Sequence, residues 1–263
     1  MSTNDGKDIF GNDQGEPRVL RGATVYSGST WIAELAGRAG FETIWIEMEH
    51  GSAGYEKVET LCLAAQAGGA VPTVRVCDSQ RCHILRALEV GAGIVLVPMV
   101  NDAEQARRIV EYGKFPPLGQ RGYNTRTRGV HYGLNGAKQA FADANDRTHL
   151  FAQIETREAV KNFDAICAVE GLSGIFIGPG DLSASFGRTG ELNHPEIIET
   201  VTDCIRRARQ AGKHAGILVA PGPLLTAALE AGCDLAFFAG DVMDLANAWP
   251  KVLATVAVGK ANG

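Results

Sequence analysis

The chain has 263 residues and a mass of 27.9 kDa, and 45% of its residues are hydrophobic, which allows a sizeable core. Its formal net charge is -5 and its pI is about 5.7, without a block of like charge. This balance gives no electrostatic reason to expect binding to a nucleic acid or a membrane surface, so small molecules are the expected partners.

The six cysteines are scattered without a CxxC pair, so neither a zinc module nor a disulfide framework is expected. The polar start of the chain lacks the apolar stretch of a signal peptide, and no segment offers about 18 uninterrupted apolar residues. These features favour a cytoplasmic protein with reduced thiols.

Residues 1–17 are rich in Gly, Asp and Asn, a composition that buries too little apolar area to offset its ordering entropy. We predict a flexible N-terminal tail there. After it, eight short runs of β-branched or aromatic residues alternate with longer segments of helical period. The predicted strands are Val19–Val25, Thr43–Met48, Val71–Val76, Gly93–Met99, His149–Ile154, Gly174–Ile177, His214–Val219 and Asp234–Phe238.

Between these strands, apolar residues recur at helical spacing, and several of the segments end at glycine. The predicted outer helices are Glu56–Ala67, Gln80–Glu89, Ala103–Tyr112, Glu158–Val169, Glu196–Gln210 and Pro223–Ala231. Strands that are almost continuously apolar are expected to be buried on both faces, as in a parallel sheet covered by helices. We therefore predict a single (β/α)8 TIM barrel over residues 18–263.

One connection is longer than the others and runs from Lys114 to His131 before the strand at His149. A loop of this length in a compact domain is usually functional or disordered. Its arginines and aromatic residues favour a segment that covers the substrate.

Two carboxylates follow the ends of two predicted strands, Glu155 after the fifth and Asp181 after the sixth. Residues at the carboxyl ends of barrel strands share one face, where catalytic groups collect. Carboxylate oxygens suit magnesium or manganese better than zinc. Each residue also has a plain structural alternative, since Asp181 could cap a helix and Glu155 could pair with Arg157 or Lys161.

Further polar residues lie at the carboxyl ends of other strands: Glu47 to Gly51 at the second, Arg75 at the third, Gln153 in the fifth, and Gly178 to Asp181 after the sixth. Stability alone gives no reason to place so many polar groups at one end of a barrel. Their convergence therefore favours an enzyme active site.

These residues resemble those of the HpcH/HpaI family of metal-dependent (class II) pyruvate aldolases. The similarity spans roughly residues 18–256 and rests on the segments Ile44–Gly51, Val74–Arg75, Leu96–Val100, Pro116–Gly122, Gln153–Thr156 and Ile175–Ser183. It implies a phosphoenolpyruvate/pyruvate-type (β/α)8 barrel, usually hexameric, that cleaves 4-hydroxy-2-oxo acids to pyruvate and an aldehyde.

The resemblance also implies individual roles. Glu155 and Asp181 match the ligands of a divalent cation, Mg²⁺ or Mn²⁺, with Co²⁺ as an alternative. Arg75 matches the arginine that holds the keto oxygen, and His50 matches the acid/base histidine. The binding site for the pyruvyl carboxylate is matched by Gln153 and the backbone of Gly178, Pro179, Gly180 and Asp181.

The chemistry fits these residue types. Cleavage between C3 and C4 leaves a pyruvate enolate, whose charge a cation and a guanidinium stabilise. A histidine, which changes charge near neutral pH, can remove the proton of the C4 hydroxyl. The alternative aldolase strategy uses a Schiff-base lysine, but no lysine falls at the carboxyl end of a predicted strand.

The chain departs from the family pattern at three places. Glu47 and Glu89 stand where relatives usually carry aspartate, and Glu89 is expected to pair with His50, directly or through water. The first strand ends in an unusual segment in which Tyr26 and Trp31 either line the far end of the substrate pocket or simply pack.

Two other functions stay open at this point. The same enolate site could decarboxylate oxaloacetate or catalyse bond formation as macrophomate synthase does. A non-catalytic barrel that binds a metal or a small acid is the alternative from another class, and the complete set of Arg75, Glu155 and Asp181 argues against it. An apolar C-terminal helix over Val242–Leu253 is expected to mediate homo-oligomerisation, and the alternative is that this helix only closes the barrel.

Overall fold

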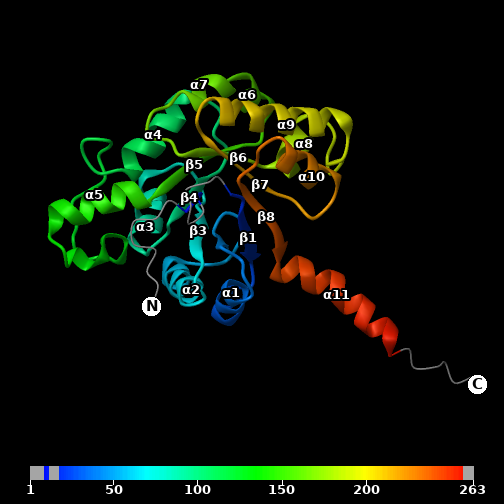
Figure 1. Cartoon of the computed structure of the whole chain (residues 1–263), viewed down its shortest axis with the longest axis horizontal. Helices are drawn as coiled ribbons and strands as arrows, with labels where there is room; N and C mark the ends of the chain where they lie inside the picture. The colour runs from blue at the N-terminus through cyan, green and yellow to red at the C-terminus, as the bar shows by residue number, and fades with distance from the viewer. Residues whose placement is uncertain (1–8, 12–17, 257–263) are drawn as a thin grey trace, which may run out of the picture.

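The computed structural model describes residues 9–11 and 18–256, in which eight parallel strands close into a barrel in chain order (Figure 1). The strands are β1 (Leu20–Val25), β2 (Thr43–Glu47), β3 (Val71–Arg75), β4 (Ile94–Val97), β5 (His149–Ile154), β6 (Gly174–Ile177), β7 (His214–Leu218) and β8 (Leu235–Gly240). Each agrees with its predicted run to within two residues at either end. The prediction of a (β/α)8 barrel is therefore confirmed.

Helices follow the strands, and most of them cover the outer face of the sheet (Figure 1). They are α1 (Thr30–Arg38), α2 (Tyr55–Ala67), α3 (Arg81–Glu89), α4 (Ala103–Gly113), α5 (Ala137–Arg147), α6 (Arg157–Lys161), α7 (Phe163–Cys167), α8 (Pro179–Ser185), α9 (Pro195–Gln210), α10 (Pro223–Glu230) and α11 (Asp241–Thr255). None of the helices in the described part of the chain combines the length and apolarity that crossing a membrane requires.

The predicted helix over Glu158–Val169 is wrong as a single element. The chain forms two short helices, α6 and α7, that meet at Asn162. The Asn162 side chain donates to the carbonyl of Asn101 at 2.8 Å. Asparagine competes for backbone partners in this way, which explains why it interrupts a helix that the apolar spacing alone would continue.

The long connection after α4 contains the 3-10 helix η1 (Arg128–Gly133) and α5. It packs against the carboxyl end of α3, where a side chain on Gly129 would lie 2.1 Å from the Leu88 carbonyl. The end of α3 leads into the start of β4. This is the face of the barrel opposite the carboxyl ends of the strands. This packing keeps η1 away from the barrel mouth of its own chain, so this part of the connection does not form the predicted substrate cover.

Aromatic rings fill the interior of the barrel. Trp45 lies 5.1 Å from both Phe176 and Phe237, measured between ring centroids, and all three are buried. Glycines on neighbouring strands make room for these rings: a Cβ on Gly22 would lie 2.2 Å from Phe237, and one on Gly216 would lie 2.4 Å from Phe176. The core is thus close-packed and carries no channel.

The floor of the barrel is closed by part of the segment that was predicted to be a flexible tail. Ile9 and Phe10 are only 8% and 3% exposed. Phe10 stacks on His214 at 3.7 Å and meets the edge of His149 at 5.2 Å. The tail prediction is therefore wrong for these two residues, because their apolar side chains cover the open end of the core. The rest of residues 1–17, apart from Gly11, lies outside the described residues.

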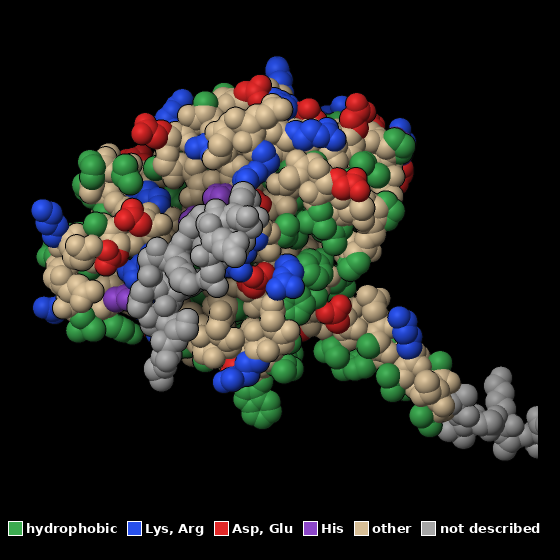
Figure 2. Space-filling view, viewed as in Figure 1, with side chains coloured by type: hydrophobic (Ala, Val, Ile, Leu, Met, Phe, Trp, Pro, Cys, Tyr) green, Lys and Arg blue, Asp and Glu red, His purple; other side chains and the backbone are tan. Residues whose placement is uncertain are grey.

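The last helix does not return to the barrel. α11 points away from β8, and Figure 1 shows it as a projecting arm. Figure 2 shows hydrophobic side chains along this arm. Its exposed apolar residues are Val242, Leu245, Trp249, Val252 and Leu253. Beside its origin lies an apolar hollow of about 380 Å³, lined by residues that include Val19, Leu225, Leu229 and Phe238.

Candidate active site

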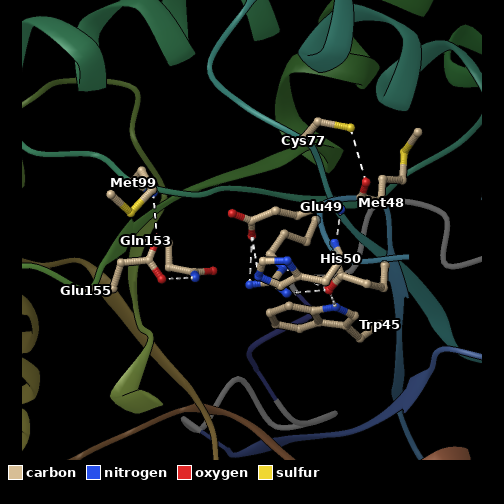
Figure 3. A network of polar contacts seen from close by, with 10 residues as sticks. Trp45, Met48, Glu49, His50, Cys77, Met99, Gln153 and Glu155 are labelled. Atoms are coloured by element: carbon tan, nitrogen blue, oxygen red, sulfur yellow. Dashed lines mark hydrogen bonds and ion pairs between the residues drawn. The ribbon is translucent and has the colours of Figure 1, made fainter. Parts of the chain in front are cut away.

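The candidate site lies at the carboxyl ends of the strands. Alternate residues of a strand point to the same side of the sheet. A residue two positions further along a strand than a buried interior ring therefore also points into the barrel. This alternation takes β2 from Trp45 to Glu47 and β5 from Phe151 to Gln153 and Glu155. Figure 3 shows the resulting cluster, with Gln153 and Glu155 on one side and Trp45 on the other.

Glu47 is buried and forms the centre of one half of the cluster. Its Oε2 accepts from Arg75 Nε at 2.8 Å and from Trp45 Nε1 at 2.9 Å. Its Oε1 accepts the backbone N–H groups of Glu49 at 2.6 Å and His50 at 3.0 Å. Burial acts to raise the pKa of this carboxyl, but the bonds and charge of Arg75 and the other donors outweigh it, so the pKa is lowered.

Arg75 is 6% exposed and is held from two sides. Its Nη2 lies 2.6 Å from Glu47 and its Nη1 lies 2.9 Å from Glu49 Oε2. The guanidinium also lies 5.1 Å from the centre of the Trp45 ring, in a cation–π contact. Burial works against the charged form, yet Glu47 and Glu49 raise the pKa of Arg75 overall. The cation is therefore permanently charged and fixed in position.

His50 stands at the edge of this half. Its side chain is 62% exposed, and its Nε2 lies 3.9 Å from Glu49 Oε2. Burial, together with the charges of Glu47 and Asp181, raises the pKa of Glu49 against the opposing effect of Arg75 and His50. Glu49 thus connects the arginine with the histidine.

Glu155 forms the other half and is 2% exposed. Its Oε1 accepts the backbone N–H of Met99 at 2.7 Å, and its Oε2 accepts from Gln153 Nε2 at 2.5 Å. Met99 adopts a φ of 56°, an uncommon conformation for a residue other than glycine, and this turns its N–H toward the carboxylate. Burial and the charges of Glu49 and Asp181 raise the pKa of Glu155 despite the two hydrogen bonds.

Asp181 lies on the first turn of α8 and is exposed at the mouth. Gly178, which precedes this helix, has no room for a side chain, since a Cβ there would lie 2.6 Å from Glu155 Oε2. The close approach brings the β6–α8 turn against Glu155. Three carboxylates, those of Glu49, Glu155 and Asp181, consequently influence one another across the mouth.

Comparisons with known proteins identify the family. The family model for HpcH/HpaI aldolase/citrate lyase matches residues 25–244. The chain belongs to this family. It is 34% identical to a hydroxypyruvate/pyruvate aldolase of Roseobacter denitrificans, over 93% of this chain and 95% of the relative. It is 35% identical to a 2-keto-3-deoxy-L-rhamnonate aldolase of Klebsiella pneumoniae, over 90% of each chain.

A solved structure shows the same architecture. The HpcH/HpaI aldolase of Desulfitobacterium hafniense superposes with a TM-score of 0.85 at 28% identity, over 91% of this chain and 93% of that one. The match of this chain to that structure and to the two aldolases shows that the chain belongs to a family of enzymes. The resemblance predicted from the strand-end motifs is thereby confirmed.

The structure brings together most of the residues that the sequence singled out. Arg75, His50, Gln153, Glu155 and the turn from Gly178 to Asp181 all lie at the mouth. Sequence reasoning did not assign roles to Glu49 or to the backbone N–H of Met99. The position of Glu49 two residues after Glu47 was a usable signal, whereas the backbone turn at Met99 leaves no mark in residue type.

The structure corrects the predicted pairing of Glu89 with His50. Glu89 ends α3, which carries its last residue about 12 Å from its first, toward the opposite face of the barrel. There its Oε1 accepts from Arg121 Nη2 at 2.8 Å and from Nε at 3.2 Å. Among the described residues Glu89 is thus paired with Arg121 and not directly with His50, because the helix that holds it runs away from the strand ends.

In the described part of the chain, the buried lysine whose pKa is lowered most does not lie at the mouth. Lys114 is buried, and burial lowers its pKa to about 8, as a reactive amine would require. Its Nζ, however, donates to the carbonyl of Thr148, 2.6 Å away and directly before β5. That position is at the amino end of the strand, on the face opposite Glu155.

The pairing of Glu89 generates a prediction on stability. Arg121 is almost fully buried, with 1% of its side chain exposed, so removing its partner leaves an uncompensated charge. Glu89→Ala should lower the free energy of unfolding by about 3 kcal/mol, measured by denaturant titration. The matched control is Glu104→Ala on the exposed surface of α4, where we expect a change below about 1 kcal/mol. Equal effects in the two variants would contradict a structural role for Glu89.

Proposed function

We propose that this protein is a divalent-metal-dependent aldolase that reversibly cleaves a 4-hydroxy-2-oxo acid into pyruvate and an aldehyde. The observation that carries the proposal is the fixed guanidinium of Arg75 at the same mouth as Glu155 and Asp181. Cleavage between C3 and C4 places negative charge on the former keto oxygen. Fixed positive groups around that oxygen lower the free energy of the charge as it develops.

The donor set at the mouth fits a hard divalent cation. Burial and neighbouring carboxylates disfavour a charged Glu155, and a cation would remove that penalty. Carboxylate oxygens suit Mg²⁺ or Mn²⁺, with Co²⁺ as an alternative. Within residues 9–11 and 18–256, no three His, Cys, Asp or Glu side chains form a cage, so Glu155 and Asp181 would leave positions for substrate and water. When bound, the cation supplies positive charge beside the keto oxygen.

The protein's own groups then bind and orient the substrate. Arg75 donates to the keto oxygen with a guanidinium that Glu47 and Glu49 hold in place. Gln153 Nε2 gives one N–H to Glu155 and has a second for the pyruvyl carboxylate. The backbone N–H groups of Gly180 and Asp181 offer further donors to that carboxylate.

The remaining step is a proton transfer at the C4 hydroxyl. His50 is exposed at the mouth and is therefore accessible to a substrate or a bridging water. We assign it as the base that accepts the hydroxyl proton during cleavage and returns it during addition. Positioned acids and bases of this kind contribute about 10² to 10⁴-fold in rate.

A panel assay tests the proposed function. Pyruvate is offered with assorted aldehydes in the addition direction, and oxaloacetate is offered separately, each with Mg²⁺, Mn²⁺ or Co²⁺. We expect metal-dependent addition of pyruvate to at least one aldehyde. Decarboxylation of oxaloacetate without any aldol addition would assign a different reaction to the same site.

The first prediction that follows from this proposed function concerns the divalent cation. Because Glu155 and Asp181 are proposed as its protein ligands, chelation should abolish turnover without unfolding the protein, and Glu155→Ala or Asp181→Ala should do the same. Activity is followed by pyruvate release, and the fold by circular dichroism. Full activity after chelation, with metal content verified by elemental analysis, would rule out the metal-dependent mechanism.

The second prediction concerns Arg75. A lysine cannot reproduce the planar fork that bonds Glu47 and reaches the keto oxygen. Arg75→Lys should therefore lose activity almost as severely as Arg75→Ala, by about 100-fold or more. Exchange of the pyruvate methyl protons in deuterated water measures this step without an aldehyde. Arg107→Lys, on the exposed face of α4, is the control, and wild-type exchange by Arg75→Ala would contradict the assignment.

The third prediction concerns assembly. The apolar arm of α11 and the apolar hollow beside its origin are surfaces that a second copy would cover, and the family resemblance implies a hexamer. Light scattering should give a multiple of 27.9 kDa. Trp249→Asp should lower that mass, whereas Leu134→Asp, at an even more exposed apolar residue of the long connection, should not. A monomer at working concentrations would contradict the prediction.

A further inference from the structure

Tyr26 directly follows β1 and belongs to the inner side of the barrel. Leu20 packs among the interior rings, a Cβ on Gly22 would strike Phe237, and positions two apart share a side, which also directs Tyr26 inward. The register pairs Val25 with Ile46, which places Tyr26 level with Glu47. Trp31, the other residue of this segment, is instead 85% exposed on α1.

The phenol of Tyr26 is part of the charged cluster. It lies close enough to Glu47, Arg75 and Glu49 for their charges to act on it, and it is 38% exposed. Burial, assisted by Glu47, raises its pKa against the effect of Arg75, so the hydroxyl keeps its proton and can donate. A side-chain hydrogen bond to Glu47 contributes to this raised pKa, so the hydroxyl proton is directed at Glu47. Glu47 also accepts from Trp45, Arg75 and two backbone N–H groups, so its carboxylate stays compensated when the hydroxyl turns to a substrate oxygen.

The backbone that carries Tyr26 is held by Asp241, the first residue of α11. Its carboxylate accepts the N–H of Tyr26 at 3.0 Å and that of Ser27 at 2.9 Å, and it is 8% exposed. A third bond, from the N–H of Val242 at 2.8 Å, fixes the carboxylate itself. The turn after β1 is thus anchored to the start of the C-terminal helix.

The position of β1 indicates which part of a substrate Tyr26 would meet. In the closed barrel, β1 and β5 are separated by three strands in either direction. The 2-oxo acid end of the substrate is assigned to Glu155, on the β5 side, and to Arg75. The remainder of a longer substrate then extends past Arg75 toward β1.

Resting on the proposed function, we propose that the Tyr26 hydroxyl is a specificity-determining donor to the aldehyde-derived part of the substrate, and that Asp241 is the residue that positions it. A donor at this place favours an aldehyde that carries an oxygen next to its carbonyl carbon. An alkyl aldehyde of the same size leaves the hydroxyl without that partner, which lowers its relative rate.

The test compares glycolaldehyde with propanal as acceptors for pyruvate, using the full chain with the metal that gives the highest activity. The readout is the ratio of the two kcat/KM values, because a general loss of stability or metal would lower both together. Wild type should prefer glycolaldehyde, and Tyr26→Phe should lower the ratio about tenfold. Asp241→Asn keeps the size of the side chain but cannot accept from both N–H groups equally well, so it should lower the ratio less.

The control is Tyr112→Phe, on α4 near the opposite face of the barrel, where the ratio should equal that of wild type. A wild-type ratio near one, or an unchanged ratio in Tyr26→Phe, would overturn the role of Tyr26. A ratio that falls in Tyr26→Phe but not in Asp241→Asn would overturn the positioning role alone. Failure of wild type to exchange the pyruvate methyl protons with any metal would instead show that the proposed function is wrong.

Discussion

The buried ion pair between Arg75 and Glu47 is the interaction on which the candidate site depends. A guanidinium this deep in a barrel is stable only when a carboxylate and further hydrogen bonds compensate for its lost hydration. Glu47 provides that compensation with two guanidinium contacts, while Trp45 and two backbone N–H groups hold the carboxylate in turn. Because the Arg75 guanidinium is held in place before substrate arrives, it needs no reorganisation when negative charge develops beside it.

The rigidity of this pair originates in the layer below. Trp45, which donates to Glu47, is wedged between Phe176 and Phe237, and glycines on the adjacent strands admit those rings. Further down, Phe10 closes the floor of the barrel. Because the interior is packed at the density of a crystal, a shift of one ring would be transmitted to Glu47 and then to Arg75.

The mouth separates into two halves of different electrostatic character. One half holds Arg75, with its charge opposed by Glu47 and Glu49, and the other holds Glu155 and Asp181, which oppose one another without a cation. That imbalance is the physical reason why we propose a divalent metal for the second half. Tyr26 extends the first half toward β1, and its attachment to Asp241 connects the site with the arm formed by α11.

The sequence by itself determined the barrel and most of its mouth. Short runs of β-branched and aromatic residues located eight strands, and residues at the carboxyl ends of such strands must share a face, so Arg75, Gln153, Glu155 and Asp181 could be grouped from the sequence alone. Contacts between distant segments were decided only by the tertiary structure. Helix direction removed Glu89 from the mouth, a backbone turn at Met99 supplied a donor to Glu155, and the departure of α11 from the barrel left its apolar face exposed. Residue type and spacing carry local periodicity, whereas the partner of a buried charge depends on which chain segments the packed core brings within about 3 Å of it.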